Sequence, residues 1–192
     1  MVAEIPTAQR LEVSRVPVRE AMMVLGQDGL LVFEDNGRCH VRTLTPQDYE
    51  EIYSVRLMLE TEGFRLAALH YTEDDLQGLR ENIRQMERAK SLNRVTLLDI
   101  DFHDRIMEMG RQSRLMHLWS VMRSQVQLFT ATLQREISSV ITNIREVSVE
   151  AHLKCLRGIE SSDPDMAKKC AIEHLGPWSE WLRSTRPEES AQ

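Results

Sequence analysis

Residues 11–22 read Leu-Glu-Val-Ser-Arg-Val-Pro-Val-Arg-Glu-Ala-Met, and this stretch decides how the first part of the chain is interpreted. Ser14 is a favoured N-cap residue, and a helical pattern follows it that is expected to end at Gly29. Arg15 and Arg19 lie four residues apart, so both guanidinium groups project from one side of the helix, beside its positive end. The predicted apolar face consists of Val18, Ala21, Met22 and Leu25. The stretch predicts a helix whose start suits phosphates and guanine bases.

A second interpretation stays open on these residues alone. An ordinary solvated helix would carry the same two arginines, with Arg19 in a local ion pair with an acid such as Glu12. Residues 1–45 hold five Arg against six acidic residues, so their net charge is −1. This balance does not by itself favour DNA over a solvated surface.

Short elements surround the central helix. A brief helix is predicted at residues 7–11, and two apolar runs at residues 30–33 and 39–44 follow the central helix. Asn36-Gly37 between the runs is a strong hairpin signal, because both residues tolerate positive φ. The predicted order is helix, turn, helix and a two-stranded wing, with Arg38 as a cation at the wing tip.

The composition is typical of a folded, mainly α protein. Of 192 residues, 42% are hydrophobic and 28% charged, and only eight Gly and six Pro are present, which favours long helices over short strands joined by turns. Three cysteines without a C-x-x-C pair exclude a complete set of intrachain disulfides. The N-terminus lacks a signal pattern and no apolar run is long enough for a membrane span, so we expect a cytoplasmic protein without membrane contact. The net charge of −6 argues against extensive nonspecific binding of nucleic acid along the whole protein, but it allows a small basic region that contacts DNA.

A domain boundary is predicted at Thr45, where an N-cap residue and a following Pro begin a long helical pattern. We expect a partial winged helix-turn-helix at residues 1–45, an all-α bundle of about six helices at residues 46–185 and a polar tail at residues 186–192. The predicted helices of the bundle are 46–70, 73–90, 94–110, 113–134, 137–161 and 164–184.

One carboxylate and three imidazoles of the bundle form a candidate metal site. Asp99 and His103 are neighbours on one helix face, and His152 and His174 lie among apolar neighbours on the last two predicted helices. This donor set fits Zn²⁺, Ni²⁺ or a similar divalent ion. An inward histidine is more often a hydrogen-bonded core residue than a ligand, so both interpretations stay open on the residues alone.

The run Val-Ser-Arg-x-Pro-Val-Arg-Glu-Ala at residues 13–21, together with Asn36-Gly37-Arg38, resembles the winged helix of the GntR family of bacterial transcription regulators. Glu12 stands where that family usually has Gly in the turn. Family members also have a further helix and part of a second before this point, so the N-terminus is expected to be truncated. The resemblance implies that the residues at the DNA contact are Ser14, Arg15, Pro17 and Arg19, with Gly37 and Arg38 at the wing tip.

Residues 46–184 resemble the helical ligand-binding (FCD) domain of the FadR-like branch of that family. In that domain Asp-x-x-Phe-His on one helix and single histidines on two later helices bind a divalent metal. The matching positions here are Asp99, His103, His152 and His174. The resemblance also implies that Arg56 clamps an effector's carboxylate, although an intrahelical pair with Glu60 explains Arg56 equally well.

Together, these observations predict a metabolite-responsive transcription regulator. It is expected to bind double-stranded operator DNA as a homodimer and to sense a small carboxylate effector at a divalent metal, most simply zinc. Two other interpretations remain: a ligand-sensing subunit that cannot bind DNA, and a metal-dependent hydrolase. No clear general base lies beside the candidate metal residues in the sequence, so a regulator is favoured over an enzyme.

Overall fold

Eight helices and one two-stranded sheet are formed by residues 1–139 and 142–184, which the computed structural model describes. The chain divides into two compact units, Met1–Thr45 and a second that starts at Pro46. The mainly α architecture predicted from the sequence is confirmed. The tail predicted at residues 186–192 lies outside the described residues. Within the described chain, every helix is too short or too polar to cross a bilayer.

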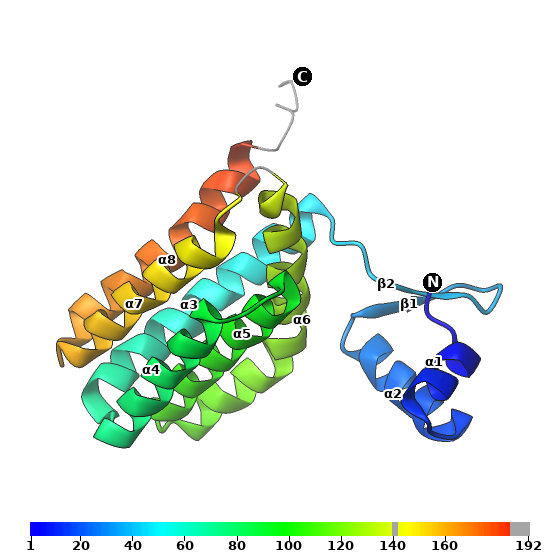
Figure 1. The fold of residues 1–192 in the computed structure, drawn as a ribbon, viewed down its shortest axis with the longest axis horizontal. Helices are drawn as coiled ribbons and strands as arrows, with labels where there is room; N and C mark the ends of the chain where they lie inside the picture. Colours follow the sequence, from blue (N-terminus) through cyan, green and yellow to red (C-terminus); the bar gives the residue numbers. More distant parts are fainter. Residues whose placement is uncertain (140–141, 185–192) are drawn as a thin grey trace. The chain divides into compact units, whose positions relative to one another are not determined.

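The first unit contains two short helices and a hairpin (Figure 1). A left-handed residue, Glu12 with φ of 56°, ends the first helix, and its N–H donates to the carbonyls of Ala8 and Gln9. This explains why glycine suits the position, since a positive φ strains any side chain with a Cβ. The elements are α1 (Glu4–Leu11), α2 (Arg15–Gln27), β1 (Leu31–Phe33) and β2 (Cys39–Val41).

The core of this unit is smaller than the sequence pattern predicted. Val18 and Met22 of α2 are buried, but Ala21 and Leu25 of the predicted apolar face are exposed. Within the unit α1 and β1 make the main contacts with α2, so they cover one narrow stripe of it. Ser14 is the N-cap residue, but its side chain makes no capping hydrogen bond. The buried apolar residues of the unit are Ala8, Val18, Met22, Leu31 and Cys39.

The wing is shorter than the two apolar runs. Its strands are antiparallel, with Phe33 opposite Cys39, and residues 34–38 form the loop. Of the two residues in the hairpin signal only Gly37 adopts a positive φ, 79°. The Asn36 side chain instead accepts a hydrogen bond of 2.9 Å from the Arg38 N–H, which mimics a backbone turn.

Six helices form the second unit, as predicted. The break between the fourth and fifth was wrongly predicted near residue 135: α6 continues to Ser138, because the segment around that residue contains neither Gly nor Pro to end it. Thr72 begins α4 with a capping box in which its hydroxyl accepts from the Asp75 N–H. The helices are α3 (Pro46–His70), α4 (Glu73–Glu87), α5 (Leu92–Met109), α6 (Ser113–Ser138), α7 (Ile144–Glu160) and α8 (Pro164–Ser184).

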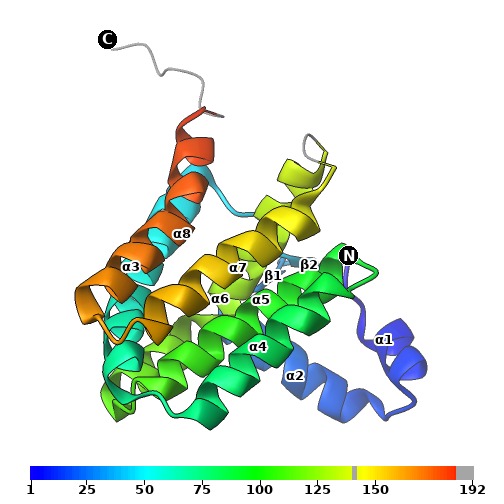
Figure 2. The same cartoon turned by 60° about the vertical axis from the view of Figure 1, so that its left-hand side comes forward.

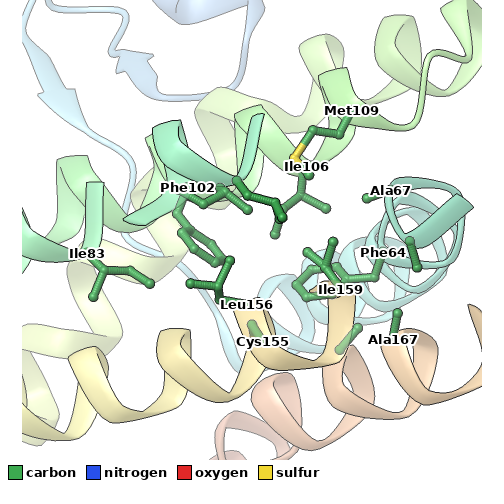
Figure 3. Packing of buried hydrophobic residues seen from close by; sticks show 14 residues of the cluster. Phe64, Ala67, Ile83, Phe102, Ile106, Met109, Cys155, Leu156, Ile159 and Ala167 are labelled. Carbon is green, nitrogen blue, oxygen red and sulfur yellow. The ribbon is translucent and has the colours of Figure 1, made fainter. Parts of the chain in front are cut away.

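Helix α3 packs against α5, α6, α7 and α8, most extensively against α8. Figure 2 shows α3 running beside α8. The apolar residue Phe64 of α3 joins a cluster of fourteen buried side chains that includes Phe102 of α5 and Leu156 of α7 (Figure 3). Gly63 of α3 leaves room for the Met107 side chain of α5, because a Cβ there would meet the Met107 sulfur. The polar residues described next lie in the same bundle of helices.

Candidate metal centre

The structure brings together the four residues that the sequence singles out. Asp99 and His103 lie one turn apart on α5, His152 comes from α7 and His174 from α8. One oxygen or nitrogen atom from each residue lies within 4.8 Å of the corresponding atoms of the other three. Asp99, His103 and His152 are buried, and His174 is partly buried. Three helices from distant parts of the sequence therefore converge on a single small volume.

The hydrogen bonds behind two of the imidazoles direct their electron pairs into this volume. The His152 Nδ1 atom lies 2.7 Å from the Ser148 carbonyl oxygen, which can only accept, so the ring proton is on Nδ1. The His152 Nε2 atom then presents a lone pair to Asp99 Oδ1, 3.3 Å away. Two acceptors that face each other in this way are stabilised by a cation between them.

His103 has the same arrangement. Its Nδ1 lies 2.5 Å from Glu60 Oε2, and its Nε2 lies 3.2 Å from the His174 Nε2. A carboxylate behind Nδ1 holds the proton on that side of the ring and orients Nε2 for a metal. Phe102 packs edge-on against His152, with ring centroids 4.6 Å apart, and limits the orientations of that ring.

Electrostatics favour the protonation states that ligands need. Burial alone would raise the pKa of Asp99, but a hydrogen bond from His152, formed when its Nε2 carries a proton, and the positive charges around the carboxylate, that of Arg56 among them, lower the pKa below the usual range. A cation in the place of that proton has the same effect on the carboxylate. Burial and the neighbouring histidines lower the pKa of His174 well below its ordinary value. Asp99 is thus ionised and His174 neutral at pH 7, which are the forms that coordinate a metal.

Arg56 and Glu60 form a buried ion pair beneath these residues. The Arg56 Nε atom donates to Glu60 Oε1, its Nη1 donates to Thr130 Oγ1 at 3.2 Å, and its Nη2 lies 4.0 Å from Asp99 Oδ2. Burial opposes both charges, but the pair lowers the pKa of Glu60 and raises that of Arg56, so both stay charged. The intrahelical pair considered from the sequence is present, and it is continuous with the four candidate ligands.

Glu60 is the functional residue that sequence reasoning missed. It was considered only as a partner for Arg56, although it also contacts His103. The available signal was two opposite charges four residues apart on the same helix face as the apolar residues Leu59 and Phe64. Such a pair in a buried stripe indicates an ionic network rather than a solvated surface.

Several buried polar atoms of this network have no hydrogen-bond partner among the described residues. These atoms are Asp99 Oδ2, His152 Nε2, His174 Nδ1, Arg56 Nη2, Glu60 Oε2 and His103 Nδ1, and the last two face each other as an ion-pair contact. Unpartnered buried acceptors are costly, and a divalent ion would satisfy those of Asp99 and His152. One carboxylate and three imidazole nitrogens are a donor set that Zn²⁺ or Ni²⁺ accepts. The residues present therefore fit a metal.

A cavity of about 150 Å³ opens beside the four residues. Two of the four candidate ligands, Asp99 and His174, line it, and the rest of its wall comes from α6, α7 and α8. Arg56 is not among the described residues that line it. The lining residues are Asp99, Gln134, Ile137, Ile144, Val147, Ser148, Ala151, His174 and Pro177.

The predicted DNA-contacting arginines lie together at the start of α2. Arg15 and Arg19 have side chains 58% and 64% exposed, and both contact Glu4 of α1 rather than the Glu12 considered from the sequence. The Arg19 Nε atom donates to Glu4 Oε1 at 2.8 Å and its Nη2 to Oε2 at 3.1 Å. Ser14 and Pro17 are exposed in the same first turn, and Gly37 and Arg38 are exposed at the wing.

Comparison with known proteins places these features among transcription regulators. The FCD domain model matches residues 51–176. The chain is 24% identical over 184 residues to the uncharacterised HTH-type transcriptional regulator YdhC of Bacillus subtilis, a match that covers 94% of this chain and 80% of that protein. It is 26% identical over 172 residues to the gluconate operon transcriptional repressor of Bacillus licheniformis, covering 88% and 70%. The solved structure of McbR/YncC from Escherichia coli matches with a TM-score of 0.79 at 20% identity, covering 95% of this chain and 86% of that one.

Proposed function

Because the chain belongs to the GntR family of transcription regulators, in the FadR-like branch with an FCD domain, we propose that it couples operator binding to the sensing of a small organic acid. Residues 1–45 bind double-stranded DNA, and the bundle holds a divalent metal, most simply zinc, that the acid reaches. The regulator acts as a cytoplasmic homodimer. The observation that carries the proposal is the convergence of Asp99, His103, His152 and His174.

Exposed cations at a helix start support the DNA-binding part. Arg15 and Arg19 project from the first turn and a half of α2, where the helix dipole also favours anions. Arginine there can bond to guanine in a major groove or to phosphate, and Arg38 supplies a second cationic contact at the wing. Ser14 and Pro17 leave the turn open to the DNA backbone, because neither adds a large side chain.

The bundle supports the sensing part through its own residues. A bound divalent ion supplies an electrophilic position for a carboxylate. Glu60 and the Ser148 carbonyl orient His103 and His152, and the proposal gives Arg56 the role of holding Glu60 and Asp99. Its guanidinium is 1% exposed and paired, so an effector's carboxylate reaches the cavity beside Asp99 and His174 instead.

Regulation requires that the acid bind one arrangement of the dimer better than another. An acid with equal affinity for both arrangements would shift nothing. If the acid changes the affinity of the dimer for operator DNA by a given factor, then operator DNA changes the affinity for the acid by that same factor. The relatives reported above are transcription regulators, so this function is proposed in preference to metal-dependent hydrolysis.

Two matched pairs of variants test the two parts. Metal content by mass spectrometry should be one Zn²⁺ per chain for the wild type and for His117→Ala, which changes an exposed histidine, but should fall strongly for His152→Ala. A stoichiometric metal content in His152→Ala would contradict the centre.

For the DNA part, fluorescence anisotropy with promoter fragments from the protein's own genomic neighbourhood should show about tenfold weaker binding for Arg19→Ala. Arg84→Ala removes another exposed, ion-paired arginine, from α4, and should bind as the wild type does. Equal DNA affinities of the two variants would contradict the assignment of α2 as the helix that contacts the DNA. Absent specific binding by the wild type, with metal retained, would favour a sensor that cannot bind DNA.

A further inference from the structure

The lining of the cavity beside His174 combines a small polar group with a mainly aliphatic wall. Asp99 and His174 lie together, with donor atoms within 4.8 Å of each other, while the lining residues from α6, α7 and Pro177 are mainly aliphatic. Among the described lining residues there is no Lys or Arg to receive a second anionic group. The aliphatic lining residues are Ile137, Ile144, Val147, Ala151 and Pro177.

We propose that the acid sensed here is a short aliphatic monocarboxylate of about four to six carbons, with its carboxylate at Asp99 and His174 and its alkyl chain against Ile137, Ile144 and Val147. This inference rests on the proposed function and specifies the ligand class of the same site. The inference concerns the side chains that line the cavity, because these side chains select the part of the ligand that lies beyond its carboxylate.

Hydroxyl groups on the ligand would find few partners in this wall. Gln134 and Ser148 supply the polar lining outside the metal residues, and the Gln134 Oε1 atom already accepts from Thr96 Oγ1 at 2.6 Å. A sugar acid would bring several hydroxyls into contact with aliphatic side chains, and a buried hydroxyl without a hydrogen bond loses its hydration without compensation. The alkyl chain of a fatty acid is stabilised by the same contacts.

The neighbouring surface offers no free cation to a second carboxylate. A groove that shares Val147, Ala151, His174 and Pro177 with the cavity is also lined by Glu150, Lys154 and Glu173. Lys154 lies 3.2 Å from Glu150, and Glu173 lies 3.8 Å from Lys169, so the charged side chains of the groove are already paired. A dicarboxylate that extended from His174 would therefore find no unpaired cation among the described residues that line this groove.

The size of the cavity sets the chain length. A volume of about 150 Å³ is the size of an apolar cavity that holds a benzene ring, which has six carbons. Each buried methylene strengthens binding by about fourfold until the chain fills the space. Hexanoate should therefore bind about fifteenfold more tightly than butyrate, and decanoate should gain nothing further.

The test uses three acids of six carbons with the Zn²⁺-loaded, full chain. Calorimetric titration should give hexanoate the highest affinity, with gluconate and adipate at least tenfold weaker, and thermal shifts should follow the same order. Gluconate differs from hexanoate only in its hydroxyls, and adipate only in its second carboxylate. An affinity for either that equals or exceeds that for hexanoate would overturn the inference.

Two serine variants on α7 test the wall itself. Val147→Ser, which changes a half-exposed lining residue, should weaken hexanoate by about threefold to tenfold without loss of Zn²⁺. Leu153→Ser is the control, because Leu153 is also exposed on α7 but lies outside the cavity lining. Equal hexanoate affinity of the two variants would contradict the assignment of the wall.

Failure of this inference is separable from failure of the proposed function. A chain that holds Zn²⁺ and releases its operator with gluconate, not with hexanoate, would be a regulator of the proposed kind with a different ligand. A chain that holds no Zn²⁺ and binds none of the three acids would overturn both proposals.

Discussion

The two units of the chain place charged groups in opposite environments. In residues 1–45 the apolar core has five members, and the arginines of α2 stay at the surface. In the bundle a cluster of fourteen buried apolar side chains lies in the same helices as a charged network that is itself buried. A surface that binds DNA must keep its cations accessible to the phosphates. A metal site binds its ion more strongly when the side chains that hold the ion are removed from water, because electrostatic interactions are less screened there.

Both units contain an Arg–Glu pair, and the two pairs illustrate this difference. Arg19 and Glu4 join α1 to α2 with side chains 64% and 26% exposed. Arg56 and Glu60 lie one turn apart on α3, each 1% exposed. Water and salt screen the first pair, while the second cannot lose one member without leaving an isolated charge in the interior. Each prediction below tests whether this difference in environment controls the outcome.

The largest effect is expected for Arg56→Ala. It should lower the free energy of unfolding of the metal-free chain by about 3–5 kcal/mol, because Glu60 remains buried without its partner. The matched variant Arg19→Ala breaks an exposed pair and should leave the unfolding of the bundle unchanged. Urea denaturation followed by tryptophan fluorescence measures this, since all three tryptophans follow residue 45. Similar losses in both variants would mean that the environments of the pairs do not differ in the way described.

The next effect is that of Zn²⁺ on the bundle. At a free concentration 100 times its dissociation constant, Zn²⁺ should stabilise the wild type by about 2.7 kcal/mol, because it binds only the folded site. His152→Ala should lose this gain, and His117→Ala should keep it. Hydrogen exchange should localise the added protection to α5, α7 and α8, which carry the candidate ligands. Protection confined to α1 and α2 would contradict the assignment.

A smaller effect, of opposite sign, is expected at the turn of the first unit. Glu12→Gly should stabilise residues 1–45 by about 1 kcal/mol, because Glu12 is exposed and holds φ of 56°. Slower amide exchange in α1 and α2 would report the gain.

Arg111 provides the contrast in the bundle, with φ of 49°. Its side chain donates to the His70 carbonyl and to Asp75 at 3.2 and 3.1 Å, so Arg111→Gly relieves the backbone but loses both contacts and should not stabilise the bundle. Stabilisation of the bundle by Arg111→Gly would show that relief of the positive φ alone sets the stability change at both turns, whatever side-chain contacts are lost.

The smallest effect concerns Glu4. Because Glu4 contacts both Arg15 and Arg19, Glu4→Gln should free the two arginines for phosphate and raise operator affinity severalfold, with a steeper dependence on salt. Anisotropy at two salt concentrations measures this. Weaker binding by Glu4→Gln would mean that Glu4 orients the arginines for DNA instead of competing with it.

Sequence reasoning predicted most accurately where the residues carry local signals. The start of α3 at Pro46 and that of α8 at Pro164 were predicted because an N-cap residue and a following proline mark them. The end of α6 was missed, since no comparable signal separates it from the helical pattern that precedes it. At Ala21 and Leu25 the periodicity was correct, but the amount of surrounding structure decides burial, and a helix pattern does not contain that information.

The candidate site shows the same limit. Four of its residues could be named from their types and spacing, but the approach of Glu60 to His103 depends on how α3 packs against α5. Within that packing Gly63 faces the side chain of Met107, a contact between positions 44 residues apart in the sequence. The aliphatic wall of the cavity likewise combines side chains from three helices, and none of those helices indicates a pocket by itself.

The most direct test of the central claim is operator binding by the Zn²⁺-loaded chain, titrated with hexanoate and followed by fluorescence anisotropy, for the wild type and His152→Ala. The account predicts tight, sequence-dependent binding by the wild type whose dissociation constant changes with the acid. In His152→Ala the acid should have no effect, because the candidate centre is broken while Arg15 and Arg19 are intact. The same acid response in both proteins would show that the four converging residues do not control DNA binding.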